Sequence, residues 1–378
     1  SVQSKQIMKR LKKIFTLKNI LKGITIIISL SLLLSYLCPF VRPDSWEIIA
    51  LFGLAYPVII VCHLIITITW IFINKKWALG LGIIILMGGN LHFRTFTIGG
   101  GDDSNGAAEV KIMSYNVHLF DLYNSEPGQA HRNKDKIIQY VANENPDIVC
   151  FQEFFYQDRP SDFVTKDTLI QLLETKDYHE RYTQYKKGRR NFGISIFSKY
   201  EIIEKGDIVF PDNQPTFNYC IYADIVTPED TVRVYNIHLQ SIRLQKMDYA
   251  VFDDKTKKKS SSGFFLVLGK VKKAFPVRAN QTDKLVEHIN NSPHPVVVCG
   301  DFNDTPMSYT YNQFNSVLTD AFRNSSFGIG KTYAGKIPAG RIDYIFHSDQ
   351  IGSNNFVIQD ENLSDHYAIS CSIFKKTE

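Results

Sequence analysis

The sequence predicts an α/β domain with packed sheets inside and helices outside, preceded by an all-α transmembrane region. Residues 20–95 consist largely of long apolar runs. From residue 109 onward, short strand-like runs rich in Val, Ile, Phe and Tyr alternate with amphipathic stretches. A polar, glycine-rich linker, GGGDDSNG at residues 99–106, separates the two parts. We therefore divide the chain into a basic tail (1–19), a transmembrane region (20–95), a linker (96–108) and a main domain (109–378).

Composition and charge exclude several classes of protein. A chain of 378 residues with 44% hydrophobic and 21% charged residues can bury a sizeable core, which excludes a disordered or collagen-like chain. The net charge is +5, but residues 1–22 alone hold seven basic residues and no acid, so the main domain is mildly acidic. This balance argues against a domain that holds long nucleic acid by charge alone. The six cysteines have no metal-binding spacing, and we interpret them as buried thiols without excluding a disulfide.

Three apolar runs are candidates for membrane spans, at residues 20–37, 48–73 and 77–93. A cleaved signal peptide is the alternative for the first run, but no small-x-small site follows it and the second run begins at once. The third run is weaker because it is rich in glycine and carries Asn90 and His92. Two or three spans are therefore open, and three are favoured.

The distribution of basic residues predicts the orientation of these spans. The basic tail and Lys75-Lys76 favour the cytoplasmic side, whereas the loop at 39–47 has one Arg and two acids and favours the outside. Three spans place the main domain outside the cytoplasm, and two would place it inside.

In the main domain, strands are expected at 110–115, 147–152, 193–198, 217–225, 231–239, 295–300, 342–347 and 366–374, and helices at 133–144, 165–175 and 277–289. The runs on either side of residues 228–230 predict an antiparallel hairpin. Segment 241–276 differs, because lysines surround the apolar run 264–268. It is either a solvated insertion or a basic, partly apolar flap that touches a membrane surface or a phosphate-bearing substrate.

Polar side chains recur where the expected strands end. They occur in the motifs SYN at 114–116, QE at 152–153, NIHL at 236–239, GDFND at 300–304, RIDYIF at 341–346 and SDH at 364–366. One such residue alone is usually a turn or cap, but six sites in one domain are hard to explain as turns. Carboxylate and carbonyl oxygens suit Mg²⁺ or Mn²⁺, and His and Asn donors suit a phosphoryl group whose charge grows in the transition state.

Taken in this order, the motifs resemble those of the endonuclease/exonuclease/phosphatase superfamily over roughly residues 109–374. The amino-terminal spans make the whole chain similar to bacterial membrane-anchored members, which implies an integral protein of the bacterial cytoplasmic membrane. The resemblance implies a four-layer α/β sandwich with two sheets packed face to face. It also implies an active site at one end of the sheets that needs a divalent metal, Mg²⁺ with Mn²⁺ as an alternative.

The resemblance implies a role for each motif residue. At the metal, Glu153 is the main ligand, Asn116 lies beside it near the phosphate, and Asp365 supports the metal or the charge balance of the site.

For the hydrolytic step, Asp301 orients and deprotonates the attacking water, and Asn303 hydrogen-bonds the phosphoryl oxygens. His238 and His366 flank the phosphate, and Asp343 holds His366 in the right tautomer.

Arg190 and Asn191, with Arg189 before them, lie where such proteins contact substrate, although a solvated loop is an equal alternative. His118 stays unassigned, and Asp304 is interpreted as a turn residue.

Together these observations predict a membrane-anchored, metal-dependent phosphoesterase that uses activated water. Its expected partners are the lipid bilayer and a phosphoester, whether nucleic acid, phospholipid head group or small molecule, and no protein partner is evident. The rival hypothesis is a non-catalytic membrane scaffold or binding module that keeps the fold. A protein that had lost its catalytic activity would have lost at least one of the polar site residues, because such residues are unfavourable to keep without a function. All eight assigned catalytic and metal positions are intact.

Overall fold

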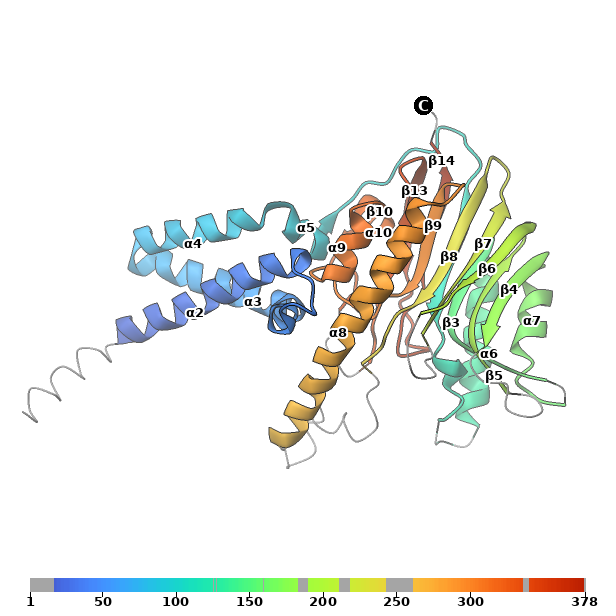
Figure 1. The fold of residues 1–378 in the computed structure, drawn as a ribbon, viewed down its shortest axis with the longest axis horizontal. Coiled ribbons are helices and arrows are strands. Elements are labelled where there is room, and N and C mark those ends of the chain that lie inside the picture. The colour runs from blue at the N-terminus through green and yellow to red at the C-terminus, as the bar shows by residue number, and fades with distance from the viewer. Residues whose placement is uncertain are drawn as a thin grey trace, which may run out of the picture.

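The structure is a computed structural model that describes residues 17–376, apart from 125, 127, 159, 183–189, 211–217, 243–260 and 336–339. Arg189, most of the basic tail and the lysines at 255–259 lie outside the described residues. A helical arm projects from one side of a sandwich of two sheets (Figure 1).

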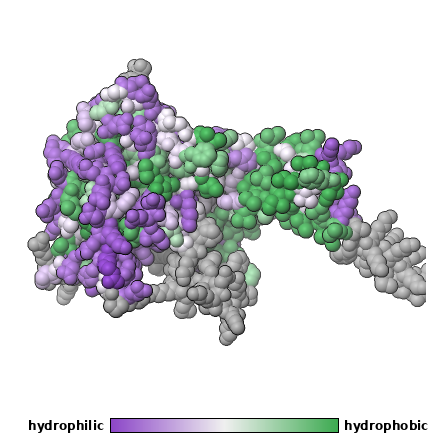
Figure 2. All heavy atoms as spheres, turned by 180° about the vertical axis from the view of Figure 1, so that it is seen from behind, coloured by the Kyte–Doolittle hydropathy of each residue, from purple (hydrophilic) through white to green (hydrophobic). Residues whose placement is uncertain are grey.

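The arm consists of α2 (Leu17–Leu37), α3 (Glu47–Ile73) and α4 (Lys75–Gly88), followed by the short helices η2 (Gly89–Leu91) and α5 (His92–Thr95). Its polar side chains point inward: Trp70 donates to Thr25 at 2.8 Å, and Ser29 lies 3.3 Å from the buried His63. The outer surface is apolar and almost continuous (Figure 2). This distribution is the reverse of that in a water-exposed bundle.

By length and composition, three helices of the arm could cross a membrane: Leu17–Phe40, Glu47–Ile73 and Lys75–Thr95. The third has the lowest mean hydropathy, 1.2 against 2.0 and 2.5, in line with its glycines. α2 and α4 both end beside the sandwich, and the turn between α3 and α4 lies at the far end of the arm (Figure 1).

The first sheet has the strand order β13-β14-β2-β3-β5-β4, and the second has the order β10-β12-β9-β8-β7-β6. The bounds in the first are β2 (Val110–Asn116), β3 (Ile148–Gln157), β4 (Asp177–Tyr182), β5 (Arg190–Ser198), β13 (Ile351–Ile358) and β14 (Ile369–Lys375). In the second they are β6 (Ile202–Ile208), β7 (Tyr219–Val226), β8 (Thr231–His238), β9 (Val296–Asp301), β10 (Thr319–Asp320) and β12 (Asp343–His347). The two-residue strands β1 (Thr97–Ile98) and β11 (Phe327–Gly328) pair separately.

Alternating side chains along the strands build three apolar layers. Ile112 of β2 packs between the sheets against Val297 of β9, whereas its neighbour Met113 faces the outer helices α6 (Gln129–Glu144) and α7 (Thr165–Leu172). On the opposite face, Val298 packs against α8 (Ser261–Asn290) and α9 (Tyr309–Asn315). The predicted four-layer α/β sandwich with an all-α amino-terminal region is confirmed.

The sequence analysis missed β4, β6 and β13, and each of these is an edge strand of its sheet. Edge strands are solvated on one side, so polar residues interrupt their apolar pattern, as in DYHERY of β4. The strand expected at 366–374 begins only at Ile369, because His366 forms an isolated bridge with Tyr333. The remaining helix, α10 (Ala321–Ser325), and the turns η1 (Cys38–Phe40) and η3 (His118–Asp121) connect these elements.

Helix α8 begins well before the expected residue 277 and passes through Pro276. A proline normally ends a helix, but here the turns before it bury Val267, Val271 and Phe275 against α3. The described part of segment 241–276 is therefore largely helix. The half of α8 that precedes Pro276 contacts the arm.

Candidate active site

Two parallel strand pairs bring polar residues to one end of the sandwich. In the first sheet β2 and β3 are parallel, with Asn116 opposite Gln152. In the second, β8 and β9 are parallel, with His238 opposite Asp301. The two ends meet, because the Asn116 side chain donates from Nδ2 to Oδ2 of Asp301 at 3.0 Å across the sheets. The predicted convergence of the motifs is thus present at this end.

Glu153 reaches the site through a bulge, which the sequence analysis did not foresee. The strand expected to end at Gln152 continues to Gln157, and its register with β5 shifts between Phe151 and Phe154. Glu153 adopts a φ of +49°, which is rare for a residue with a side chain. A bulge redirects a side chain, and Oε1 of Glu153 lies 3.8 Å from Nε2 of His238.

The loop after β9 fixes Asp301 and Asn303. Gly300 has a φ of +148°, and a Cβ there would lie 2.0 Å from the Ile237 carbonyl oxygen, so only glycine fits. Oδ1 of Asp301 accepts from the Asn303 backbone N–H at 2.8 Å, and Asn303 Nδ2 donates to the Leu239 carbonyl at 3.1 Å. Asp304 instead forms a hydrogen-bonded ion pair with Arg278 at 3.2 Å, a structural role.

His366 and Asp343 form a buried pair. Nδ1 of His366 lies 3.0 Å from both carboxylate oxygens of Asp343, which orients the ring so that Nε2 points toward Asp301 Oδ2 at 3.7 Å. The edge of the Tyr333 ring packs against the imidazole. Thr332 Oγ1 accepts the backbone N–H of Asp343 at 3.1 Å and holds the start of β12 in place.

Burial and neighbouring charges shift the pKa values of these groups. Burial raises the pKa of Asp301 to about 6; Asp343 adds to the rise, and His366 and His238 oppose it. For His366, burial alone would lower the pKa, but the carboxylates of Asp343 and Asp301 outweigh it and raise the pKa well above its usual value. Loss of water also raises the pKa of Glu153, opposed by His118 and reinforced by the Asp365 carboxylate. The site therefore combines a carboxylate of raised pKa, Asp301, with an imidazole that neighbouring carboxylates keep protonated, His366.

Two groups of side chains could hold a metal ion. Asp301, Asp343 and His366 offer ligand atoms within 4.8 Å of one another. However, His366 binds a metal only when neutral, whereas the carboxylates of Asp343 and Asp301 raise its pKa and keep it protonated, so this group fits proton handling better. Glu153, Asn116 and Asp365 offer oxygens, and the Asp365 carboxylate adds negative charge near the buried Glu153 that a bound cation would neutralise.

Arg190 and Asn191 begin β5, opposite Gln157 and Tyr156 of β3. Asn191 is buried and its Nδ2 lies 3.5 Å from the Tyr156 carbonyl, while its Oδ1 has no hydrogen-bond partner among the described residues. Arg190 is exposed. Asn191 therefore keeps a buried acceptor available on β5, the strand that pairs with the bulged β3, and Arg190 beside it faces solvent.

Sequence reasoning gave no role to Asn236 or His118. Asn236 joins the two sheets behind the site: it accepts from Gln152 Nε2 at 2.7 Å and donates to the carbonyls of Phe151 and Ser195, both at 2.9 Å. Its place between Tyr235 and Ile237, inside an otherwise apolar stretch of the strand, was the available signal. His118, half exposed, lies 3.7 Å from Asp365.

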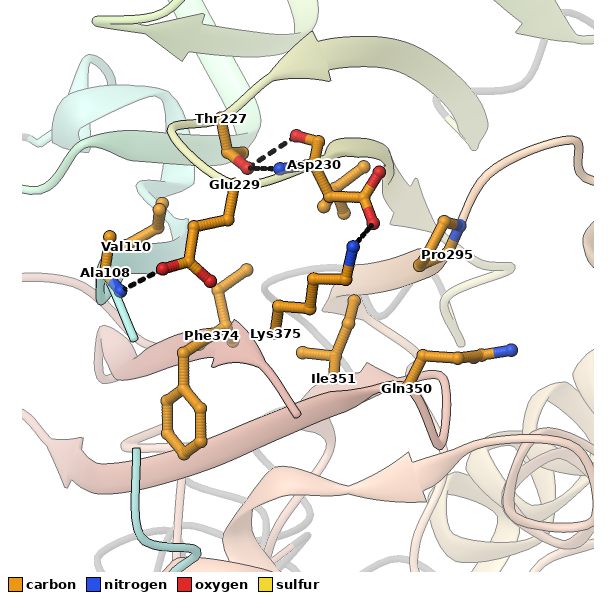
Figure 3. A pocket seen from close by; sticks show the side chains of 12 residues that line it. Ala108, Val110, Thr227, Glu229, Asp230, Pro295, Gln350, Ile351, Phe374 and Lys375 are labelled. Carbon is orange, nitrogen blue, oxygen red and sulfur yellow. Dashed lines mark hydrogen bonds and ion pairs between the residues drawn. The ribbon is translucent and has the colours of Figure 1, made fainter. Parts of the chain in front are cut away.

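A hollow lies at the opposite end of the sandwich, where β2 begins and β14 ends (Figure 3). Its polar groups satisfy one another: Glu229 accepts the Ala108 backbone N–H at 2.8 Å, and Lys375 pairs with Asp230 at 3.0 Å. The chemistry is therefore concentrated at the end that carries Glu153 and Asp301.

Comparison with known families assigns the chain to a protein family. A model described as the Endonuclease/Exonuclease/phosphatase family matches residues 113–366, from β2 to His366. The chain belongs to the endonuclease/exonuclease/phosphatase family. A second family model, described as a domain of unknown function, matches the arm at residues 18–96. No curated protein matches the chain.

Solved structures of endonuclease/exonuclease/phosphatase proteins are similar to this chain. One from Beutenbergia cavernae is 14% identical, covers 71% of this chain and 72% of its own, and gives a TM-score of 0.49. A family protein from Bacteroides thetaiotaomicron is 19% identical, with coverages of 72% and 100% and a TM-score of 0.48. A mannosyl-6-phosphatase from the same species is 19% identical, with coverages of 70% and 99% and a TM-score of 0.46.

Proposed function

We propose that this protein is a membrane-anchored, divalent-metal-dependent phosphoesterase that hydrolyses a phosphoester by attack of an activated water on phosphorus. The observation that carries the proposal is the convergence of Glu153, Asp301, His238 and the Asp343–His366 pair at one end of the sandwich. Membership of the endonuclease/exonuclease/phosphatase family supports the same reaction class.

Asp301 is the proposed general base. Its carboxylate accepts hydrogen bonds from Asn116 and from the Asn303 backbone, which leaves it oriented toward the centre of the site. A pKa near 6 lets it be ionised at neutral pH and still accept a proton from water.

The imidazoles and Asn303 stabilise the charge that grows on the phosphoryl oxygens. His238 and His366 approach Asp301 Oδ2 at 3.6 and 3.7 Å, so both imidazoles lie close to the same oxygen. Asp343 keeps His366 protonated and fixes its orientation. The Asn303 side chain provides a further donor next to them.

Glu153, Asn116 and Asp365 would hold the divalent ion, Mg²⁺ or Mn²⁺, which when bound polarises the phosphoryl group. Arg190 and Asn191 would contact the substrate beyond the bulge of β3. The buried acceptor of Asn191 fits a hydroxyl or amine donor, and Arg190 fits a second phosphate or another anion.

The arm is proposed to span a bacterial cytoplasmic membrane three times, with the linker 96–108 leading to a catalytic domain, 109–378, outside the cytoplasm. Its inward polar and outward apolar residues support insertion in lipid. The chain enters the arm at its far end with α2 and leaves it beside the sandwich with α4, which supports an odd number of spans before the catalytic domain.

The test is a hydrolysis panel on the full chain in detergent or nanodiscs, with Mg²⁺ and with chelator. It includes DNA, RNA, phosphosugars, phospholipids and a generic nitrophenyl phosphodiester. Asp301→Asn is the inactive control, and Asp349→Asn, an exposed residue on the other end of the second sheet, is its match. Mg²⁺-dependent turnover that Asp301→Asn abolishes supports the proposal. Binding of a substrate without turnover would instead favour the non-catalytic scaffold.

A further inference from the structure

Two loops of the active site rest directly on the helical arm. The loop after β9 places Met307 among Leu32, Tyr36 and Tyr56 of α2 and α3, only six residues after Asp301. A Cβ on Gly53 of α3 would lie 2.6 Å from the Met307 carbonyl oxygen, so the loop and the helix are in close backbone contact. The active site is therefore packed against the arm rather than tethered to it by a flexible linker.

The second loop follows His238 at the end of β8. Four residues later, Ile242 packs with Leu51 and Leu54 of α3 and with the first half of α8. The buried Arg278 of α8, 1% exposed, joins the two loops: it donates to Asp304 at 3.2 Å and to the Gln240 carbonyl at 2.8 Å. Helix α8 thus braces both loops and the arm as one unit.

The first half of α8 runs across the direction of α2–α4 and its start projects past the sandwich end of the arm (Figure 1), while Val267, Val271 and Phe275 pack on α3. Lys272 pairs with Glu47, the first residue of α3, at 2.9 Å. If α3 crosses the bilayer, this ion pair marks the level at which the helix leaves the hydrocarbon, and the first half of α8 lies at that level along the membrane surface.

The outward face of this half-helix has the composition of a lipid-contacting surface. Phe265 is 67% exposed and Leu266 58% exposed, although the opposite face of the same turns is buried on α3. Leu266, Lys270 and Lys273 are spaced by four and three residues, so they lie along one side of the helix. The apolar residue is nearest the start of α8, and the two lysines follow it. Apolar side chains that enter the acyl boundary and lysines that reach the phosphates have this arrangement.

We propose that residues 265–273 of α8 lie in the headgroup region of the bilayer that the arm spans, and that the active site consequently acts on a phosphoester carried by an amphiphile of that leaflet. This inference rests on the proposed phosphoesterase function and on the proposed insertion of the arm. It identifies the substrate by position: the contacts through Met307 and Ile242 hold the reacting end of the sandwich beside the lipid head groups.

The position of α8 is tested without reference to turnover. An environment-sensitive fluorophore is attached to Leu266→Cys in the full chain, reconstituted in vesicles of phosphatidylcholine and phosphatidylglycerol. The background is Cys62→Ala, because the other five cysteines are buried. The matched control is Glu287→Cys, exposed near the opposite end of the same helix. We expect quenching by a lipid-borne quencher at 266 and by an aqueous quencher at 287. Aqueous quenching alone at both positions overturns the proposal.

The substrate class is tested with two nitrophenyl phosphodiesters, one on a long-chain lipid in the vesicle and one on a short, water-soluble chain. The double change Leu266→Ser with Lys273→Glu should lower hydrolysis of the lipid form roughly tenfold, the scale of losing a surface contact, and leave the soluble form unchanged. An equal loss on both substrates, or no loss on either, overturns the proposal. If the unaltered chain cleaves neither substrate, the phosphoesterase function itself fails, and the fluorophore at 266 still decides whether α8 meets lipid.

Discussion

Replacing Asp343 by Asn separates the orientation of His366 from its charge. In the native pair, both carboxylate oxygens of Asp343 lie 3.0 Å from Nδ1 of His366, and both residues are buried. Asparagine keeps an acceptor at this position but removes the negative charge. The ring should therefore remain in place while its pKa falls.

The size of the fall follows from Coulomb's law. Two unit charges about 4 Å apart interact by about 4 kcal/mol at an effective dielectric constant of about 20. One pKa unit corresponds to about 1.4 kcal/mol, so losing the Asp343 charge should lower the pKa of His366 by about three units. Because the native pKa of His366 is raised, the imidazolium form persists as pH rises through neutrality and is lost only above it. In Asp343→Asn the imidazolium form should be lost at correspondingly lower pH.

The assay is the pH dependence of kcat on one phosphodiester, together with NMR titration of His366. We expect the alkaline limb of the profile to move down by about three pH units, with turnover at low pH reduced less than in His366→Ala. Asp349→Asn, an exposed change of the same kind, should leave the profile unchanged. An alkaline limb that does not move in Asp343→Asn would refute the assignment of the imidazolium to His366, even if kcat fell.

Three further predictions concern the metal, the base and the topology. Chelation should abolish turnover and Mg²⁺ or Mn²⁺ should restore it, and Glu153→Gln should raise the metal concentration needed for half-maximal rate; an unchanged metal titration would remove Glu153 from the ligand set. Asp301→Asn should lower kcat by about 10²-fold or more, and the native rate should rise with pH through about 6 as this carboxyl ionises; a profile flat across that range would contradict its role as base. Two reporters are fused after Asn105, one that works only after export and one that works only in the cytoplasm. We expect activity from the exported reporter alone, and activity from the cytoplasmic reporter alone would reduce the spans to two.

The interior strands and their terminal motifs could be predicted because both are written in local sequence. Strands such as β9, VVVCGD, are buried on both faces and carry an uninterrupted apolar run that ends at the polar site residue. Solvated edge strands such as β4 give no such signal. The local pattern therefore locates the centre of each sheet better than its borders.

Features that depend on contacts between distant segments could not be predicted. The bulge at Glu153 is a consequence of pairing with β5, and nothing in QEFF marks it. Helix α8 crosses Pro276 only because α3 provides a surface for the turns before it. The sequence analysis began the helix after the proline because local rules stop there.

The contact between Met307 and the arm makes part of the buried surface of the catalytic domain depend on the arm. A chain cut after Thr95 would lay bare Met307 on the active-site loop, together with Val267, Val271 and Phe275 of α8. Each fully buried side chain of this size is worth about 1.5–3 kcal/mol, and here their partners are the helices that the cut removes. A substitution in α3 must therefore also suit the loop that carries Asp301, because Gly53 and Tyr56 of α3 contact that loop at Met307.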